Sequence, residues 1–323
     1  MATTSRSAQQ MLRSVGGGAK APAGGDDMPS FMNVRQVAQY LQLNEKKIYA
    51  LASEGKVPAT KITGKWLFPR DLVDQWLLES SHGGILTDRL VVAGSDDPLL
   101  YRVVMRMANE MQANALVSYS CTGTQLGLSL LAKRRADVCA IHWGPADESL
   151  LRHRALIQRY PEHHQWVIVR AFQRAQGLIV APQVLQEHGE DVGRLLRADL
   201  RWAMRQQGSG SHRFLVEILA QHEVRLADLK HSCHAYSERD AATRVSLGEA
   251  DIAPGTRSAA HEVGLGFCAI GWEAFDLVLN KRIYFRILFQ RLMDTLNAPD
   301  TVHLAGSLSG YRLREAGRLV WPT

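Results

Sequence analysis

Three short polar segments of the chain combine hydroxyl side chains with glycine in a pattern that suits anion binding. They are Gly94-Ser95-Asp96-Asp97-Pro98, Ser120-Cys121-Thr122-Gly123-Thr124 and Gly208-Ser209-Gly210-Ser211. Each follows a strand-like run and opens a helical pattern. A helix N-terminus offers free backbone N–H groups and partial positive charge, hydroxyls add donors, and glycine allows close approach. The segments predict a site for an oxyanion or small polar ligand, although each alone is also an ordinary helix cap.

Arginine and aromatic side chains near these segments are further candidates for ligand contact. Arg213 and Arg257 lie just inside helices that follow glycine-containing loops, where they could neutralise an anion or simply be surface arginines. His142 and Trp143 follow a predicted strand, so they could line the cleft or its polar rim.

Catalysis and metal binding have weaker support in the sequence than ligand binding. Cys121 stands beside a predicted helix start, which should lower its thiol pKa, and His142 could serve as its base. No G-x-S-x-G or H-E-x-x-H motif is present. His231-Ser232-Cys233-His234 lacks a second ligand pair at zinc-site spacing. We therefore predict a binding protein with no metal and no cofactor rather than an enzyme.

A second group of candidate residues, between positions 33 and 70, suits DNA. Seven basic residues face two acidic ones in this stretch, a net charge of +5. A short helix capped by Asn44 could enter the major groove, and cations of a following hairpin could reach the phosphate backbone. The candidate DNA contacts are Asn44, Lys46, Lys47, Tyr49, Lys61, Lys65, Trp66 and Arg70. A solvated helical domain or a protein-docking module is the alternative.

The elements that would position these side chains can be read from caps and apolar spacing. Asn33 should cap a first helix with an apolar stripe at Val34, Val37, Ala38 and Leu41. In the second helix Ile48, Leu51 and Ala52 should face inward, and Gly55 should end it in the left-handed conformation. A hairpin about Thr63-Gly64 follows. A last helix after Pro69 should close the core with Leu72, Val73, Trp76 and Leu77.

Residues 33–78 resemble the excisionase-type, MerR-like helix-turn-helix family. The resemblance rests on Val34-x-x-Val37-Ala38-x-x-Leu41, on Ile48-Tyr49, on Gly55-x-x-Pro58, on Gly64-Lys65-Trp66 and on Pro69-Arg70-Asp71-x-x-x-x-Trp76-Leu77. The family often begins its recognition helix with Ser, and Asn44 stands there in this chain. The resemblance implies a winged helix-turn-helix that binds DNA.

Composition limits the class of protein. The chain has 323 residues, 46% hydrophobic residues and a net charge of +6, of which residues 1–82 carry ten basic against seven acidic side chains. Its four scattered cysteines suggest reduced cytoplasmic thiols, and no apolar run suggests a membrane span or secretory signal. We expect a disordered segment at 1–29, a DNA-binding domain at 30–79, a flexible linker at 80–87 and a ligand-sensing domain at 88–323.

The large domain alternates strand-like and helical patterns, which predicts an α/β fold with a mostly parallel sheet. Strands are expected at 90–93, 116–119, 138–141, 166–169, 178–180, 200–204, 251–253, 266–270 and 275–279. Helices are expected at 99–111, 124–134, 212–222, 239–247 and 284–295. In such a sheet a ligand lies beyond the carboxyl ends of the strands, where the three polar segments should meet.

Residues 88–315 resemble the two-lobed type II periplasmic-binding-protein-like domain of bacterial one-component regulators. The motifs are Ala93-Gly94-Ser95-x-Asp97-Pro98, Arg135-Ala136-Asp137-Val138-x-x-Ile141-His142, Gln176-Gly177-Leu178-Ile179-Val180-Ala181-Pro182, Gly208-Ser209-Gly210-Ser211-x-Arg213 and Glu249-Ala250-Asp251-Ile252. The resemblance implies a clamp that closes on a small molecule, often in relatives tied to molybdate, tungstate or molybdopterin metabolism. It adds Gln176 to the candidate ligand contacts.

Together the two parts predict a ligand-responsive transcription regulator, and one short reading helix per chain favours a homodimer on a DNA operator. The candidate ligand contacts are Ser95, Asp96, Ser120, Cys121, Thr122, Gly123, Thr124, His142, Trp143, Gln176, Ser209, Gly210, Ser211, Arg213 and Arg257. The alternative is a DNA-binding architectural or recombination-directing protein whose large domain docks a protein partner.

Overall fold

The computed structural model describes residues 30–54, 57–82 and 89–321. The chain divides into two compact units, Met1–Gly84 and Ile85–Thr323, and each is described by itself. The expected disordered segment 1–29, the helix-ending Gly55 and most of the expected linker lie outside the described residues.

The first unit is a small helix-turn-helix with a β-hairpin wing. Its elements are β1 (Phe31–Met32), α1 (Val34–Tyr40), α2 (Glu45–Ser53), β2 (Thr60–Ile62), β3 (Lys65–Pro69) and α3 (Arg70–His82). Asn33 forms a capping box with Gln36 at the start of α1. The Asn44 side chain accepts the Lys47 backbone N–H at 2.7 Å and caps α2. Both predicted caps are confirmed.

The wing follows from a two-residue turn. Thr63 and Gly64 have φ values of 48° and 84°, and two positive values in succession suit a type I′ hairpin turn. The hairpin strands pair antiparallel from Thr60–Leu67 to Ile62–Lys65. Strand β1, which the sequence analysis missed, pairs with β3 on its other side.

The core of the first unit is smaller than expected at α3. Met32, Val37, Ile48, Phe68 and Val73 are fully buried. Trp76 packs against this core, as expected. Leu72 and Leu77, also predicted to lie in the core, are 50% and 42% exposed, because only one face of α3 meets the helix-turn-helix. Helix α3 also includes residues 80–82, which were expected in the linker.

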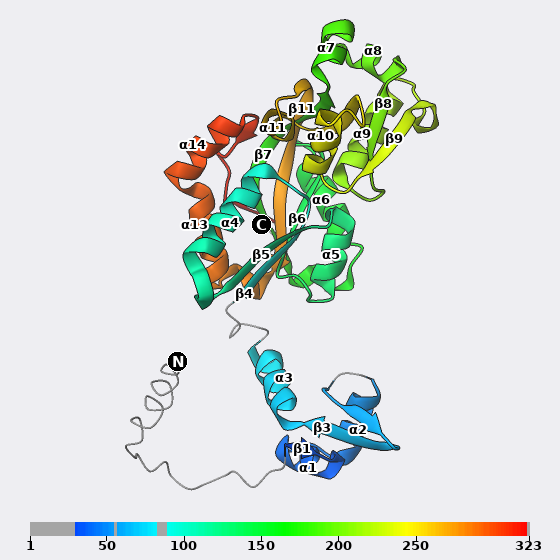
Figure 1. Cartoon of the computed structure of the whole chain (residues 1–323). Coiled ribbons are helices and arrows are strands. Elements are labelled where there is room, and N and C mark those ends of the chain that lie inside the picture. The colour runs from blue at the N-terminus through cyan, green and yellow to red at the C-terminus, as the bar shows by residue number, and fades with distance from the viewer. Residues whose placement is uncertain (1–29, 55–56, 83–88, 322–323) are drawn as a thin grey trace, which may run out of the picture. The chain divides into compact units, whose positions relative to one another are not determined.

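The second unit is built on one ten-stranded sheet (Figure 1). Its main path is β5-β4-β6-β11-β7-β10-β8-β9, and β12 and β13 both pair with β7. The strands are β4 (Arg89–Gly94), β5 (Leu116–Cys121), β6 (Val138–Pro145), β7 (Trp166–Val180), β8 (Arg201–Arg205), β9 (Lys230–Ala235), β10 (Ile252–Thr256), β11 (Gly266–Asn280), β12 (Tyr311–Arg312) and β13 (Leu319–Trp321).

Helices cover both faces of this sheet. They are α4 (Pro98–Met111), α5 (Thr124–Ala132), α6 (Ser149–Ile157), α7 (Pro182–His188), α8 (Val192–Arg197), α9 (Gly210–Gln221), α10 (Glu238–Ser246), α11 (Arg257–Glu262), α12 (Lys281–Tyr284), α13 (Ile287–Asn297) and α14 (Pro299–Leu308), with short 3₁₀ turns at 112–114, 161–165 and 226–228. Each of the five predicted helices corresponds to one of these. None of the described helices is both long enough and apolar enough to cross a membrane.

Two long paired strands, β7 and β11, run through both lobes of the unit and connect them (Figure 1). Lobe 1 contains β4–β6, the first half of β7, the second half of β11, and helices α4–α6 and α12–α14. Lobe 2 contains β8–β10, the remaining halves of the long strands, and α7–α11. Separate apolar clusters form the two lobes: Leu90, Phe172 and Phe289 belong to lobe 1, and Leu178, Trp202 and Leu215 to lobe 2.

The long strands correct two expectations about the sheet. Each replaces two predicted strands, because polar residues such as Arg174 interrupt the apolar pattern where the strand passes between the lobes. The expected mostly parallel sheet is wrong as well. Pairing is parallel among β4, β5 and β6 and among β8, β9 and β10, but β7 and β11 run antiparallel to their neighbours. The sheet is therefore mixed.

Candidate ligand cleft and nucleic-acid interface

The three polar segments meet where the lobes face each other. Within lobe 1, the Ser95 and Thr124 hydroxyls lie 2.9 Å apart, and the Thr122 hydroxyl accepts the Gly94 N–H at 3.1 Å. Lobe 2 contributes Gly210, which packs so closely on the His142 ring that a Cβ there would lie 2.2 Å from a ring carbon. The segments that the sequence placed at strand ends therefore form one region.

Several of the predicted donors in this region already have partners within the protein. Ser209 accepts the His212 backbone N–H as the cap of α9, and Ser211 donates to Glu238. Ser95 and Ser211 are 3% and 1% exposed, whereas Ser120 is exposed. These hydroxyls thus make contacts within their own lobes, and a ligand would have to displace those contacts or use other groups.

A buried arginine organises the centre of the cleft. Arg174, in the middle of β7, is fully buried, and its guanidinium lies 2.8 Å from Glu273, 3.0 Å from Asp97 and 3.0 Å from Glu238. Its plane also stacks on the Phe275 ring at 4.5 Å. Burial alone would lower the pKa of Arg174, but the charges of Glu238, Glu273 and Asp97 raise it well above its ordinary value. The side chain stays a cation and joins both lobes.

His142 lies beside this cluster. Its Nδ1 is 2.8 Å from Glu273 and its Nε2 is 3.8 Å from Glu238, so the ring bridges two carboxylates. Burial would raise the pKa of Glu273, but the charges of His142 and Arg174, and their hydrogen bonds, hold it below its ordinary value. The Gln176 amide, with its nitrogen turned toward Glu273, donates to that carboxylate at 3.1 Å.

A second ion pair joins the lobes at their edge. Asp96 of lobe 1 is 4% exposed and lies 2.7 Å from Arg239 of lobe 2. Burial would raise the pKa of Asp96, but the hydrogen bond and charge of Arg239 lower it below its ordinary value. The Cys121 thiol donates to Asp96 at 3.0 Å.

The environment of Cys121 overturns the expected thiol activation. Burial, followed by the charge and hydrogen bond of Asp96, raises the Cys121 pKa to about 12 instead of lowering it. The predicted helix start is present, but its weak dipole does not offset a buried neighbouring carboxylate. The thiol remains protonated at neutral pH and is a poor nucleophile.

The rim of the cleft carries an aromatic and charged cluster. The guanidinium groups of Arg152 and Arg213 each lie 5.2 Å from the centre of the Trp143 ring. The Trp143 indole N–H donates to Glu217 of α9 at 2.9 Å, so the ring connects the lobes. Arg257 lies elsewhere: it stacks on Phe267 at 5.1 Å and packs against Gly310. The structure thus brings Arg213 to the cleft and leaves Arg257 outside this cluster.

The sequence analysis did not predict five charged residues of the cleft: Arg174, Arg205, Glu238, Arg239 and Glu273. Some had a local signal. Glu238 and Arg239 directly follow the helix cap Ser237, and Arg205 directly follows the predicted strand 200–204, shortly before the Gly-Ser-Gly segment. Arg174 and Glu273 lie inside long strands, where nothing local distinguishes a buried charge from a solvent-facing one.

The candidate DNA contacts of the first unit divide into two groups. Lys46, Lys47 and Tyr49 are exposed on α2, with Tyr49 at 51%, and Asn44 uses its side chain to cap this helix. These residues can approach a major groove at the helix N-terminus.

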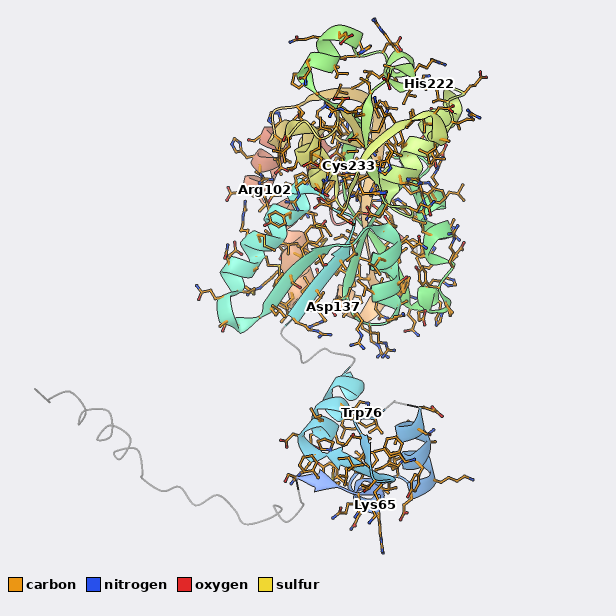
Figure 2. All side chains as sticks on the ribbon, turned by 45° about the vertical axis from the view of Figure 1, so that its right-hand side comes forward. Lys65, Trp76, Arg102, Asp137, His222 and Cys233 are labelled. Carbon is orange, nitrogen blue, oxygen red and sulfur yellow. The ribbon has the colours of Figure 1, made fainter. Side chains whose placement is uncertain are left out.

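The remaining candidates lie on the wing and at its base. The Lys61 ammonium lies over the Trp66 ring at 5.7 Å, and Lys65 starts the second hairpin strand (Figure 2). Arg70 lies over Tyr40 and 3.9 Å from Asp74, an arrangement that directs it along the unit's own surface. Lys61 and Lys65 are therefore better placed than Arg70 to meet a phosphate backbone.

The histidine-rich segment 231–234 forms part of β9, where the His231 and His234 rings pack edge to face at 4.3 Å. Within residues 30–54, 57–82 and 89–321, no three His, Cys, Asp or Glu side chains are grouped so that they could hold a metal ion.

Comparison with known proteins identifies both parts of the chain. Residues 31–81 match the model of a helix-turn-helix domain, and residues 106–297, more than half of the chain, match that of a PBP superfamily domain. A Bacillus subtilis relative, the uncharacterized protein YvgK, is 22% identical over 316 residues, which cover 91% of this chain and 99% of that protein.

Three solved structures resemble part of this chain at low sequence identity. PhnD1 from Prochlorococcus marinus, in complex with methylphosphonate, is 13% identical over 71% of this chain and 93% of its own, with a TM-score of 0.48. The CcmR regulatory domain of Synechocystis, in complex with 2-PG, is 13% identical over 64% and 95%, with a TM-score of 0.47. A tungstate ABC transporter structure from Geobacter sulfurreducens is 13% identical over 68% and 98%, with a TM-score of 0.48.

Proposed function

The chain belongs to the PBP superfamily, and from that premise we propose that it is a transcription regulator whose DNA binding responds to a small anionic or polar solute. In this proposal residues 30–79 bind an operator and residues 88–323 sense the solute. The observation that carries it is the presence, in one chain, of a helix-turn-helix domain and a PBP superfamily domain.

The geometry of each unit supports its assigned role. Helix α2 carries exposed Lys46, Lys47 and Tyr49, while the wing carries Lys61 and Lys65, so one unit offers cations to a groove and to the backbone. In the other unit, buried charged and polar side chains lie between two lobes, which suits a clamp that closes on a small polar solute. Oxyanions such as molybdate and tungstate are the first solutes to test.

Three further features belong to the proposal. A short α2 reads few base pairs, so a homodimer on a two-fold operator supplies the missing specificity. A regulator that binds a DNA operator acts where the DNA is, so the proposal includes a cytoplasmic location. The raised pKa of Cys121 removes the nucleophile that an enzymatic mechanism would have used, which favours binding over catalysis.

The test combines a solute screen with a DNA-binding measurement on the full chain. Thermal unfolding is followed with molybdate, tungstate, sulfate, phosphate and common metabolites; a solute at a thousand times its Kd stabilises the folded state by about 4 kcal/mol. A gel-shift assay against genomic fragments then measures whether the stabilising solute changes DNA affinity. Stabilisation with unchanged DNA affinity would contradict a ligand-responsive regulator. Absence of any DNA binding would contradict the assignment of the first unit.

A further inference from the structure

Side chains of the two lobes contact each other directly where α4 of lobe 1 meets α10 and α11 of lobe 2. Arg102 of α4 forms an ion pair with Glu262 of α11. Arg239 of α10 lies 2.7 Å from Asp96, and its guanidinium lies 4.2 Å from the centre of the Tyr101 ring. Each lobe therefore supplies one arginine and one carboxylate, and these contacts together form the α4 clasp.

A second set of contacts joins the lobes where α6 of lobe 1 meets α9 of lobe 2. Arg152 of α6 lies 2.6 Å from Glu217 of α9, and the Trp143 indole N–H donates to the same carboxylate at 2.9 Å. Arg213 of α9 lies over the Trp143 ring, 5.2 Å from its centre. Two groups of lobe 1 thus hold Glu217 of lobe 2, and these contacts form the α9 clasp.

The centre of the cleft also joins the lobes through the chain's own charged groups. Glu238 of lobe 2 lies 3.0 Å from Arg174 and 3.8 Å from His142 of lobe 1. All three side chains are at most 3% exposed. Water and salt therefore reach the centre much less than they reach the two clasps, whose arginines are 22–40% exposed.

The clasps favour closure because their charges are complementary across the cleft. In each ion pair an arginine of one lobe meets a carboxylate of the other, so the closed lobes attract each other. A single partly exposed ion pair contributes little, but one closing movement forms all of these contacts together. Closure is therefore a property of the protein's own surfaces and does not depend on what the cleft binds.

We propose that the α4 clasp and the α9 clasp hold the lobes closed independently of any ligand, as an autoinhibitory contact that a solute must wait to see broken before it enters the cleft. Entry is then limited by how often both clasps open, and salt increases that frequency. This inference goes beyond the proposed function, because it concerns the ligand-binding unit by itself and requires neither DNA nor a particular solute.

The experiment measures the distance between the lobes in the full chain without added solute. Spin labels are attached through Leu126→Cys on α5 and Leu247→Cys at the end of α10, positions that are 55% and 69% exposed on different lobes. Cys121→Ser and Cys233→Ser remove the two partly exposed native thiols. Labelled chain is diluted with unlabelled chain, so that only labels within one molecule are compared by double electron–electron resonance.

At low salt this parent protein should give one narrow distribution that matches the separation of the two labelled sites in the closed structure. The attraction between the lobes keeps the clasps formed under these conditions. A broad distribution, or one centred at a longer distance, overturns the proposal.

The double substitution Glu217→Gln with Glu262→Gln removes one carboxylate from each clasp and keeps the side-chain size. The ratio of closed to open molecules should fall by about tenfold, because both clasps lose an ion pair. Asp228→Asn with Glu249→Gln is the matched control: it removes the same charge from two arginine pairs that lie within lobe 2, so the parent distribution should persist. An unchanged distribution in the clasp variant overturns the proposal.

Salt gives a second measurement that needs no change to the clasps. An ionic strength of about 1 M shortens the screening length to about 3 Å and weakens partly exposed ion pairs. The parent should open at this ionic strength, whereas the double clasp variant should change much less. A parent that stays closed, or equal opening of both proteins by salt, contradicts the clasps as the cause of closure.

These distance measurements can fail or succeed separately from the proposed function. If the lobes close through the clasps but no solute changes DNA affinity, the proposed function fails and this inference stands. If the lobes are open without solute and a solute still changes DNA affinity, this inference fails and the proposed function stands.

Discussion

Arg174 shows how a single buried side chain can hold two lobes together. Its guanidinium contacts Asp97 of lobe 1, Glu238 of lobe 2 and Glu273 on the connecting strand β11. The cleft as a whole contains four carboxylates, Asp96, Asp97, Glu238 and Glu273, and three guanidinium groups, those of Arg174, Arg205 and Arg239. The charges of these seven groups therefore nearly balance, and the His142 ring lies between two of the carboxylates.

Replacing Arg174 should be far more damaging than replacing an arginine of a surface pair. Arg174→Met leaves three buried carboxylates without their shared counter-ion, and loss of one partner of a buried pair typically costs about 3–5 kcal/mol. Urea unfolding of the full chain measures the change in the free energy of unfolding. Arg201→Gln, which breaks a partly exposed pair with Asp251, is the control and should have a smaller effect, because only one carboxylate loses its partner and water still reaches it. Equal effects of the two substitutions would mean that the Arg174 cluster is not a central support.

Asp96 should make the free energy of unfolding depend on pH in the acid range. Because its pKa is below the ordinary value of 3.8 in the folded chain, the folded state binds this proton more weakly than the unfolded state. Its contribution to stability is therefore complete above the ordinary pKa and is lost as the pH falls through that value toward the folded pKa.

The substitution Asp96→Asn should make stability less sensitive to acid. Between about pH 5 and about pH 3, the variant should lose less free energy of unfolding than the wild type, because one carboxylate with a depressed pKa is gone. Denaturant unfolding at a series of pH values gives both curves. Parallel curves would show that Asp96 makes no such contribution. Asp71→Asn in the first unit, at an exposed aspartate, is the control.

At the scale of elements, α2 and the hairpin are the parts that would meet DNA. Asn44 starts α2 and leaves Lys46 and Lys47 exposed in its first turn, close to where base edges would lie. The β2–β3 hairpin carries Lys61 and Lys65, which can reach the backbone.

The double substitution Lys46→Ala and Lys47→Ala should weaken DNA binding. A base contact is worth about 1–3 kcal/mol, and loss of phosphate contacts also reduces the salt dependence of the affinity. Gel-shift titration at two salt concentrations measures both quantities. Lys133→Ala with Lys281→Ala removes the same charge from exposed sites of the second unit and serves as the control. Unchanged operator affinity in the α2 variant would contradict the assignment of Lys46 and Lys47 as DNA contacts.

At the scale of the whole ligand-binding unit, closure depends on a close approach between lobes. Gly210 at the start of α9 packs directly on the His142 ring, and a methyl group there would lie 2.2 Å from the nearest ring atom. Gly208 packs similarly on Gln125 of α5. Closed lobes therefore leave no space for a side chain at Gly210.

Gly210→Ala should disfavour the closed arrangement. Overpacking of this kind costs about 1–3 kcal/mol, so the thermal midpoint should fall and the affinity for a stabilising solute should weaken. DNA binding in the absence of solute should persist, because the first unit is unchanged. Gly306→Ala, at a helical glycine with open space around it, is the matched control. A Gly210→Ala variant with wild-type stability and solute affinity would show that the lobes need not close this far.

The amino-acid sequence by itself determined the features that depend on local interactions. Asn33 and Asn44 cap their helices, and the Thr63-Gly64 turn closes its hairpin. All five helices predicted in the large unit are present. Caps, turns and apolar periodicity depend on residues that are close together in the chain, so they can be predicted from the sequence alone. The two family resemblances extended this reading to a helix-turn-helix followed by a PBP-like domain, which the comparisons bear out.

The tertiary structure alone decided which charged residues face one another. Arg174 and Glu273 are 99 positions apart, and Asp96 and Arg239 are 143 positions apart, yet each pair is in contact. The unbroken length of β7 and β11, the antiparallel pairing at the centre of the sheet and the raised pKa of Cys121 also arise from distant contacts. Burial and long-range electrostatics depend on what surrounds a side chain in space, and local sequence does not contain that information.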